Sequence, residues 1–154
     1  MAKEIERKFL VRSDAWQAGV KESHAIRQGY LARGPKASIR IRVVDDASAM
    51  LTVKSAQAGR ERYEFEYLIP VGDAPMLMQL CDGRVLEKRR HIVPVGGCKW
   101  EVDVFSGDLA GLVIAELELS RADAEITYPD WLGPEVTEDA RYYNASLAAN
   151  GLPE

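Results

Sequence analysis

The sequence has few of the residues that build soft-metal sites or covalent cross-links. Among its 154 residues are two cysteines and two histidines. Cys81 and Cys98 stand in neither a C-x-x-C nor a cysteine–histidine spacing, and His24 and His91 have no paired metal-ligand spacing. This scarcity argues against a zinc site and a disulfide framework, and it predicts free thiols in a reducing cytoplasm.

Long apolar runs and glycine-rich phosphate loops are also missing. No stretch approaches the roughly twenty apolar residues of a membrane span, and charge that begins at Lys3 interrupts any signal-peptide core. Gly29 and Gly34 form no phosphate-loop pattern, and no serine or cysteine stands in a nucleophile setting. The net charge of −4 argues against non-specific binding to nucleic acid or anionic membranes. We therefore expect a cytoplasmic protein with neither a membrane nor a nucleic-acid partner.

What the chain does have is a series of segments in which charged and apolar residues alternate. Successive side chains of a strand point to opposite faces, so each segment has one charged and one apolar face. Turn signals separate several of the segments: Gly34-Pro35, Asp45-Asp46 and Gly96-Gly97. The pattern predicts about eight strands joined mainly as antiparallel hairpins, in one domain over residues 1–154. A helix is expected after Asp73, and a final helix from Thr137 to about Ala149.

The charges on these faces come in pairs that are mostly of one sign. The acidic members are Glu4, Glu6, Glu64, Glu66, Glu101, Asp103, Glu116 and Glu118, and the basic members are Lys8, Arg40, Arg42, Lys54, Arg62, Lys88 and Arg90. A single strand of this kind is most simply half-buried, with a solvated outer face. Repeated pairs of segregated sign differ from a surface selected only for solubility, which intersperses its charges. An eight-stranded sheet can also close, and its charged faces would then line the interior.

A charged interior requires ligands, because burying so many unpaired charges would be prohibitive. Clustered carboxylates suit hard cations such as Mg²⁺ or Mn²⁺. Clustered arginine and lysine side chains suit phosphate oxygens, which arginine can bind bidentately. The two sets in one tunnel predict a metal–polyphosphate site.

The order of these motifs resembles the CYTH superfamily, the triphosphate tunnel metalloenzymes, over essentially the whole chain. The segment Glu4–Lys8 matches the family's ExExK signature at the start of the chain. The other motifs of the family follow in order: an RxR at Arg40 and Arg42, a TVK that ends at Lys54, an ExE at Glu64 and Glu66, a basic pair at Lys88 and Arg90, an EVD at Glu101 and Asp103, and a late ExE at Glu116 and Glu118. The resemblance is to the short single-domain bacterial inorganic triphosphatases. It implies an α+β fold with an eight-stranded antiparallel β-barrel, helices packed outside it and a C-terminal helix. It also implies hydrolysis of a triphosphate substrate with Mg²⁺ or Mn²⁺, for which we expect two ions.

The site residues are assigned from the charged faces and the resemblance together. Metal ligands are expected to be Glu4, Glu6, Glu64, Glu66, Asp103, Glu116 and Glu118. Substrate-binding residues are expected to be Lys8, Arg40, Arg42, Lys54, Arg62, Lys88 and Arg90. The catalytic set is Glu4, Glu6, Lys8, Glu116, Glu118 and Tyr30, which shares the predicted inward face with Gln28 and resembles a pocket tyrosine of the family. Arg7 and Arg89 are out of phase with the pocket and should lie outside.

The leading function is hydrolysis of inorganic tripolyphosphate to diphosphate and phosphate by a monomer or homodimer. A class IV-like adenylyl cyclase and a nucleoside or thiamine triphosphatase are alternatives, because base recognition has no clear local signature in this sequence. A non-catalytic polyphosphate-binding module is a further alternative. The intact acidic pairs argue against that module, because binding alone needs chiefly the bases.

Overall fold

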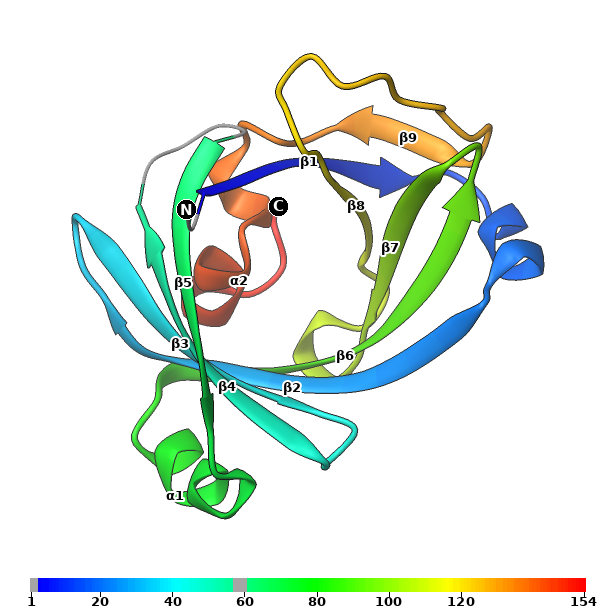
Figure 1. Cartoon of the computed structure of the whole chain (residues 1–154). Helices are drawn as coiled ribbons and strands as arrows, with labels where there is room; N and C mark the ends of the chain where they lie inside the picture. The colour runs from blue at the N-terminus through cyan, green and yellow to red at the C-terminus, as the bar shows by residue number, and fades with distance from the viewer. Residues whose placement is uncertain (1–2, 57–60) are drawn as a thin grey trace.

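An antiparallel sheet that closes on itself forms the body of the molecule (Figure 1). This computed structural model describes residues 3–56 and 61–154, which contain nine strands and two α-helices. The strands are β1 (Lys3–Val11), β2 (Glu22–Arg33), β3 (Ala37–Val44), β4 (Ser48–Ser55), β5 (Glu61–Ile69), β6 (Asp82–Val95), β7 (Cys98–Phe105), β8 (Val113–Glu118) and β9 (Leu132–Glu135). The helices are α1 (Ala74–Gln79) and α2 (Asn144–Asn150), with short 3₁₀ helices at Ala15–Gly19, Val71–Asp73, Gly107–Leu109 and Ala140–Tyr142.

Eight of the described strands close the barrel in the order β5-β4-β3-β2-β6-β7-β8-β1. Neighbouring strands are antiparallel, and the ring closes where β1 pairs with β5, with Glu4 opposite Arg62. The predicted eight-stranded antiparallel barrel is therefore confirmed. The additional strand, β9, was not predicted, and it pairs with the later part of β1, with Phe9 opposite Glu135.

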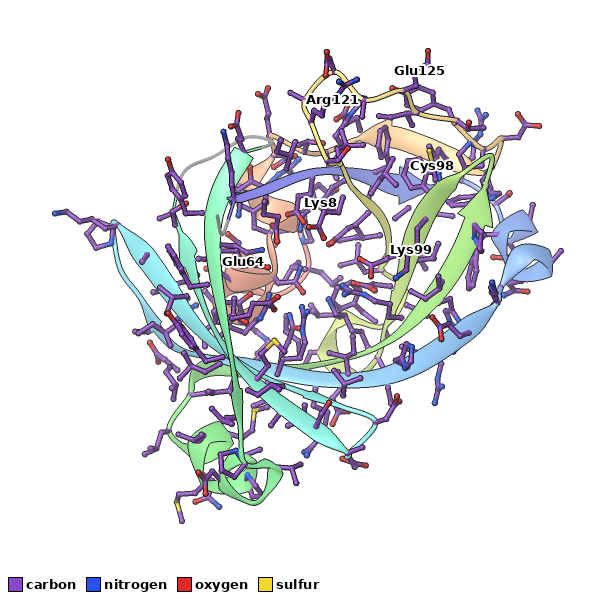
Figure 2. All side chains as sticks on the ribbon, viewed as in Figure 1. Lys8, Glu64, Cys98, Lys99, Arg121 and Glu125 are labelled. Carbon is purple, nitrogen blue, oxygen red and sulfur yellow. The ribbon has the colours of Figure 1, made fainter. Side chains whose placement is uncertain are left out.

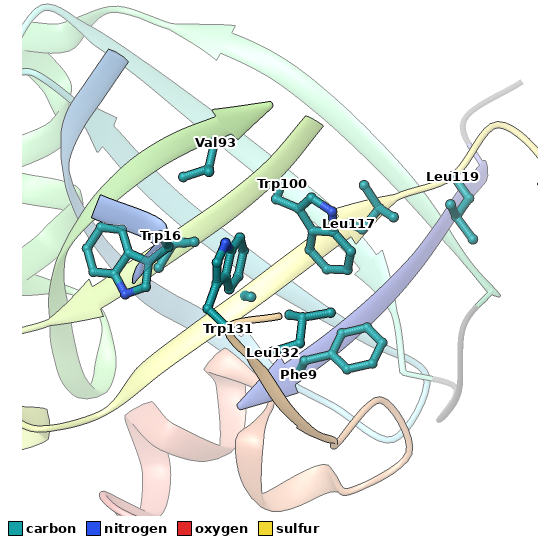
Figure 3. Close-up of a cluster of buried hydrophobic side chains, with 10 residues drawn as sticks. Phe9, Trp16, Val93, Trp100, Leu117, Leu119, Trp131 and Leu132 are labelled. Atoms are coloured by element: carbon teal, nitrogen blue, oxygen red, sulfur yellow. The ribbon is translucent and has the colours of Figure 1, made fainter. Parts of the chain in front are cut away.

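The largest apolar core lies on the outer side of the barrel wall, where β1, β7 and β8 meet β9 (Figure 3). Phe9 packs edge-to-face on Trp100 at 5.6 Å between ring centroids, and Trp100 packs on Trp131 at 6.0 Å. Each such aromatic pair adds about 0.5–1.5 kcal/mol beyond its buried area. The apolar alternates of β1, β7 and β8 thus pack outward, which leaves their charged alternates facing inward.

The two α-helices have different relations to the barrel. From outside, α1 covers Ile41 and Val43 of β3, the apolar neighbours of the inward-facing arginines. In contrast, α2 brings Leu147 and Ala148 against a cluster that includes Tyr30 and Leu86, which share their strand faces with inward-facing residues. In the view of Figure 1, α2 accordingly appears within the ring of strands. The C-terminal helix therefore borders the interior of the barrel.

The start of the last helix differs from its predicted position. Instead of one helix from Thr137, a 3₁₀ helix at Ala140–Tyr142 precedes α2. Thr137 does not cap a helix, because its hydroxyl oxygen accepts a hydrogen bond from the backbone N–H of Lys8 at 2.9 Å. This bond fixes the C-terminal segment to β1. No helix in residues 3–56 and 61–154 is both long enough and apolar enough to cross a membrane.

Candidate active site

A polar cavity of about 330 Å³ occupies the interior, and every strand of the barrel and α2 contribute to its lining. Figure 2 shows Lys8 from β1 and Glu64 from β5 directed toward this space. The strict two-residue period of the strands explains why the charged alternates converge here. The predicted site residues that line the cavity are Glu4, Glu6, Lys8, Tyr30, Arg40, Arg42, Lys54, Arg62, Glu64, Glu66, Lys88, Arg90, Glu116 and Glu118.

We call the seven lining carboxylates the acidic half of the cavity: Glu4, Glu6, Glu64, Glu66, Glu101, Glu116 and Glu118. Two lysines lie among them. The ammonium of Lys54 is 3.1 Å from Glu4 Oε1 and 3.3 Å from Glu64 Oε2. The ammonium of Lys8 is 3.1 Å from Glu116 Oε1 and 3.8 Å from Glu6 Oε1. Each lysine thus separates two carboxylates that would otherwise repel each other.

The two lysines do not balance the whole acidic half. Burial raises the pKa of Glu6, and the neighbouring Glu116 raises it further. Burial also raises the pKa of Glu118, and the charge of Glu4 raises it further. Glu116 differs: burial alone would raise its pKa, but the charges of Lys8, Arg90 and Lys88 together outweigh burial and lower it. In consequence, several carboxylates here are short of positive charge, and Glu6 even stands directly opposite Glu118 in the ladder.

We call the five remaining predicted cations the basic half: Arg40, Arg42, Arg62, Lys88 and Arg90. Asp103 holds two of them together from behind the lining, because it is fully buried and does not itself line the cavity. Arg90 donates to its two oxygens at 2.8 and 2.9 Å, and the Lys88 ammonium lies 2.7 Å away. Although burial alone would raise the pKa of Asp103, Arg90 and Lys88 hold it well below its usual range.

Two buried amides extend this arrangement to α2. Arg42 Nε donates to Gln28 Oε1 at 2.7 Å, and Gln28 Nε2 donates to Asn144 Oδ1 at 2.7 Å. Lys88 Nζ donates to the same Asn144 oxygen at 3.0 Å. Burial, with repulsion from neighbouring cations, lowers the pKa of Arg42 to about 9 and that of Lys88 to about 7. For Lys88, burial and repulsion lower the pKa by more than the close contact with Asp103 raises it. Additional negative charge in the cavity would therefore favour the charged forms of both side chains.

Two guanidinium groups of the basic half have buried N–H donors that find no acceptor in the described part of the chain. Arg40 Nε and Arg62 Nε are buried and make no hydrogen bond with residues 3–56 or 61–154. The Arg62 guanidinium also lies over the ring of Tyr143, 4.2 Å from its centroid. Buried donors that lack partners are costly, and an anionic ligand with several oxygens would satisfy them.

The remaining predictions concern residues at the edge of the site and outside it. Tyr30 lies on the predicted inward face and lines the cavity, and it also packs in the apolar cluster beside α2. Arg7 does not line the cavity; its Nε donates to Glu135 at 2.8 Å on the other side of β1. Arg89 is exposed. The strand faces of Arg7 and Arg89 are therefore as predicted.

Several residues of the lining were not assigned to the site from sequence. Glu101 was counted on a charged face but given no role, although its inward phase was the available signal. Arg33, Tyr143, Asn144 and Ser146 also line the cavity. The three residues from the C-terminal segment have no alternating pattern that could have identified them.

The donor set fits a hard divalent cation. In residues 3–56 and 61–154, no group of three or more acidic, histidine or cysteine side chains is already close enough to hold one ion. Nevertheless, Glu4 Oε1 is buried and makes no hydrogen bond within the described residues, although the Lys54 ammonium lies 3.1 Å away. Burial and the adjacent Glu64 raise the pKa of Glu4. Carboxylates that are crowded and short of positive charge are the ligands that Mg²⁺ and Mn²⁺ prefer.

Comparisons with known proteins agree with this geometry. Residues 2–151 match the family model for the CYTH domain. An inorganic triphosphatase of Acetivibrio thermocellus is 46% identical over 151 residues, covering 97% of this chain and 96% of that protein. An inorganic triphosphatase of Nitrosomonas europaea is 38% identical over 148 residues, covering 94% and 96%. The crystal structure of the inorganic triphosphatase NE1496 superposes with a TM-score of 0.70 at 36% identity, covering 97% of this chain and all of that one.

Proposed function

The chain belongs to the CYTH domain family, and we propose that it hydrolyses inorganic tripolyphosphate to diphosphate and phosphate. The observation that carries the proposal is the cavity itself, where buried guanidinium donors without acceptors face carboxylates that are short of positive charge. A phosphate chain supplies acceptors to the first group. The names of the two similar enzymes support the same reaction.

The basic half would bind the phosphate chain. Arg40 and Arg62 each have a buried Nε–H available for a phosphate oxygen. Lys88 and Arg90 are oriented by Asp103, for which we propose a positioning role in place of the metal-binding role expected from sequence. Charge-assisted hydrogen bonds from these groups would orient the chain and stabilise charge that builds up on the leaving diphosphate.

The acidic half would hold divalent metal, for which we propose Mg²⁺ or Mn²⁺ and two ions. Candidate ligands are Glu4, Glu6, Glu64, Glu66, Glu116 and Glu118. A bound divalent cation supplies positive charge that neutralises phosphate oxygens and activates water for attack.

The residues of the chain itself would guide a single displacement. A water oriented by a carboxylate such as Glu4 attacks a terminal phosphorus; one P–O bond forms while the bond to the bridging oxygen breaks, and the proton of the water passes to the carboxylate. Lys8, which Glu116 and Glu6 keep charged despite its burial, would stabilise the negative charge on the departing oxygen. We propose that the Tyr30 hydroxyl contacts the phosphate chain from the same lining. All lining residues come from one chain, so the site is complete in a monomer and equally in each subunit of a homodimer.

The decisive experiment compares substrates on the metal-loaded protein. Phosphate release should be fastest from tripolyphosphate and slower from ATP and thiamine triphosphate with Mg²⁺ or Mn²⁺, without formation of cyclic AMP. Excess chelator should abolish the activity, and added metal should restore it. Preferential cyclic AMP formation from ATP would assign the site to the cyclase reaction. Tight binding of tripolyphosphate without any turnover in either metal would make the protein a binding module.

A further inference from the structure

Asn144, the first residue of α2, occupies an unusual position in the cavity lining. It is 9% exposed, and its Oδ1 accepts hydrogen bonds from both Gln28 Nε2 and Lys88 Nζ. An ammonium can only donate, and so can the amino group of a carboxamide. The atom of Asn144 that faces these two donors must therefore be its oxygen. Chemistry thus fixes the orientation of this amide.

The orientation of Gln28 is fixed in the same way. Arg42 Nε is a donor, so the atom of Gln28 that it contacts must be Oε1, which leaves Nε2 to face Asn144. The chain of hydrogen bonds has one direction throughout, and it ends at the Asn144 oxygen. It leaves the Asn144 amino group, Nδ2, with two N–H donors to place elsewhere.

Those two donors have no acceptor within residues 3–56 and 61–154. Nδ2 makes no hydrogen bond with those residues, and it is not among the fully buried polar atoms. Because Asn144 borders the cavity, we place Nδ2 at the surface of the cavity. Lys88 donates to Oδ1 of the same amide at 3.0 Å, so its ammonium is close to Nδ2 as well. A phosphate oxygen bound to Lys88 would therefore lie beside Nδ2.

We infer that Asn144 is a further substrate-binding residue, whose Nδ2 donates a hydrogen bond to a phosphate oxygen held by Lys88. The inference rests on the proposed function and deepens it. One carboxamide then has two roles, because its oxygen positions Lys88 and its nitrogen contacts the substrate. A neutral donor suits this location, since another cation would add to the repulsion among Lys88, Arg42 and Arg90.

The first test uses Asn144→Ala and Asn144→Asp, with Asn150→Ala and Asn150→Asp as matched controls at the exposed end of the same helix. Asn144→Ala should lower kcat/KM for tripolyphosphate by about tenfold to a hundredfold, mainly through KM, as expected for a lost hydrogen bond to a charged group. Asn144→Asp keeps an acceptor for Gln28 and Lys88 but removes the donor, so it should not restore kcat/KM. Melting temperatures of all variants report folding, and the Asn150 variants should match the wild type. Wild-type kcat/KM in either Asn144 variant would overturn the inference.

A double-mutant cycle separates direct contact from positioning. If Asn144 contacts the substrate, Asn144→Ala should lower kcat/KM further in a Lys88→Met background. No further loss in that background would show that Asn144 acts only through Lys88, and it would overturn the substrate contact. If Lys88→Met does not fold, Lys88→Gln takes its place as the background of the cycle. Failure of the proposed function is a separate outcome, because wild-type protein would then release no phosphate from tripolyphosphate under any metal condition.

Discussion

The basic and acidic halves of the cavity differ in what balances their charge. In the basic half, the fully buried Asp103 is contacted by both Lys88 and Arg90, and its pKa is strongly lowered. In the acidic half, two lysines are shared among seven lining carboxylates, and the pKa values of Glu6 and Glu118 are raised. The protein thus supplies a fully buried internal counter-ion, Asp103, to the basic half, whereas Lys8 and Lys54 balance the acidic half only in part.

This difference indicates how the site is completed. Because Asp103 holds Lys88 and Arg90 in place, much of the proposed phosphate-binding surface is organised before any ligand arrives. The carboxylates of the acidic half lack equivalent partners, so cations from solution are needed to complete it. Four predictions test the comparison, in order of decreasing effect.

The largest effect should come from removing charge in the acidic half. Glu6→Gln or Glu118→Gln should lower kcat by roughly a thousandfold, or about 4 kcal/mol of transition-state stabilisation, because metal placement is lost. Steady-state kinetics at saturating Mg²⁺ measure this loss. Arg7→Ala is the matched control on the outward face of β1, and it should retain most activity. Equal losses in folded Arg7→Ala and Glu6→Gln proteins would contradict the separation of the two faces.

Removing the internal counter-ion should affect stability as well as activity. Asp103→Asn leaves Lys88 and Arg90 without their buried partner, and it should lower the free energy of unfolding by about 3–5 kcal/mol. Urea denaturation measures this difference. Asp108→Asn is the control, because Asp108 pairs with Arg84 at 3.5 Å on the exposed surface. That variant should change the free energy by less than about 1 kcal/mol, and an equally small change in Asp103→Asn would mean that Asp103 does not organise the basic half.

Ligand binding should stabilise the basic half even without metal. In excess chelator, tripolyphosphate at a hundredfold excess over its Kd should stabilise the protein by about 2.7 kcal/mol. Orthophosphate at equal concentration should raise the melting temperature less, because it reaches fewer of the five cations. Constant ionic strength in all samples removes the contribution of general screening. Equal shifts with both anions would show that these cations do not form one extended site.

The smallest effect concerns the pH dependence of stability in metal-free protein. Glu4, Glu6 and Glu118 have pKa values raised above the ordinary 4.5, so the folded state retains their protons to higher pH than the unfolded state does. Their contribution to stability should therefore decrease as the pH rises from about 4.5 through the raised values. Melting temperatures in chelator over this range test the sign, and Mg²⁺ should reduce the decline. A decline that Mg²⁺ leaves unchanged would argue against metal binding by these carboxylates.

The alternation of charged and apolar residues predicted the strands and their two faces, and the family resemblance added that the sheet closes into a barrel. Glu6 and Lys8 share one face of β1, and Arg7 lies on the other, because the period of a strand is fixed at two residues. The same rule does not predict how deeply each inward-facing side chain is buried. Asp103 has the inward phase of Glu101, yet it pairs in register with Arg90 behind the lining instead of opening onto the cavity.

The C-terminal contributions to the site depend on tertiary contacts that leave no local pattern. Strand β9 is four residues long and contains Gly133 and Pro134, so it has neither alternation nor strong strand propensity. Thr137 was expected to cap a helix because threonine is a common N-cap residue. Its hydroxyl oxygen instead accepts a hydrogen bond from the backbone N–H of Lys8 in β1. Asn144 reaches the cavity only because of the path that residues 119–143 follow around the barrel.

The closure of the barrel by β1 has a consequence for how the protein acquires activity during folding. β1 is the first of the described strands, but Lys8 contacts Glu116, 108 positions later in the sequence, and its backbone N–H bonds to Thr137, 129 positions later. Contacts so distant in sequence carry a high loop-closure entropy and form slowly. During synthesis, Lys3–Ile5 can pair with β5 early, but the pairing of Glu6 and Lys8 with β8 must wait until β8 has emerged. Because β1 contributes Glu4, Glu6 and Lys8, recovery of activity after denaturation should coincide with the last step of folding, and the rate of phosphate release can serve as a kinetic signal for barrel closure.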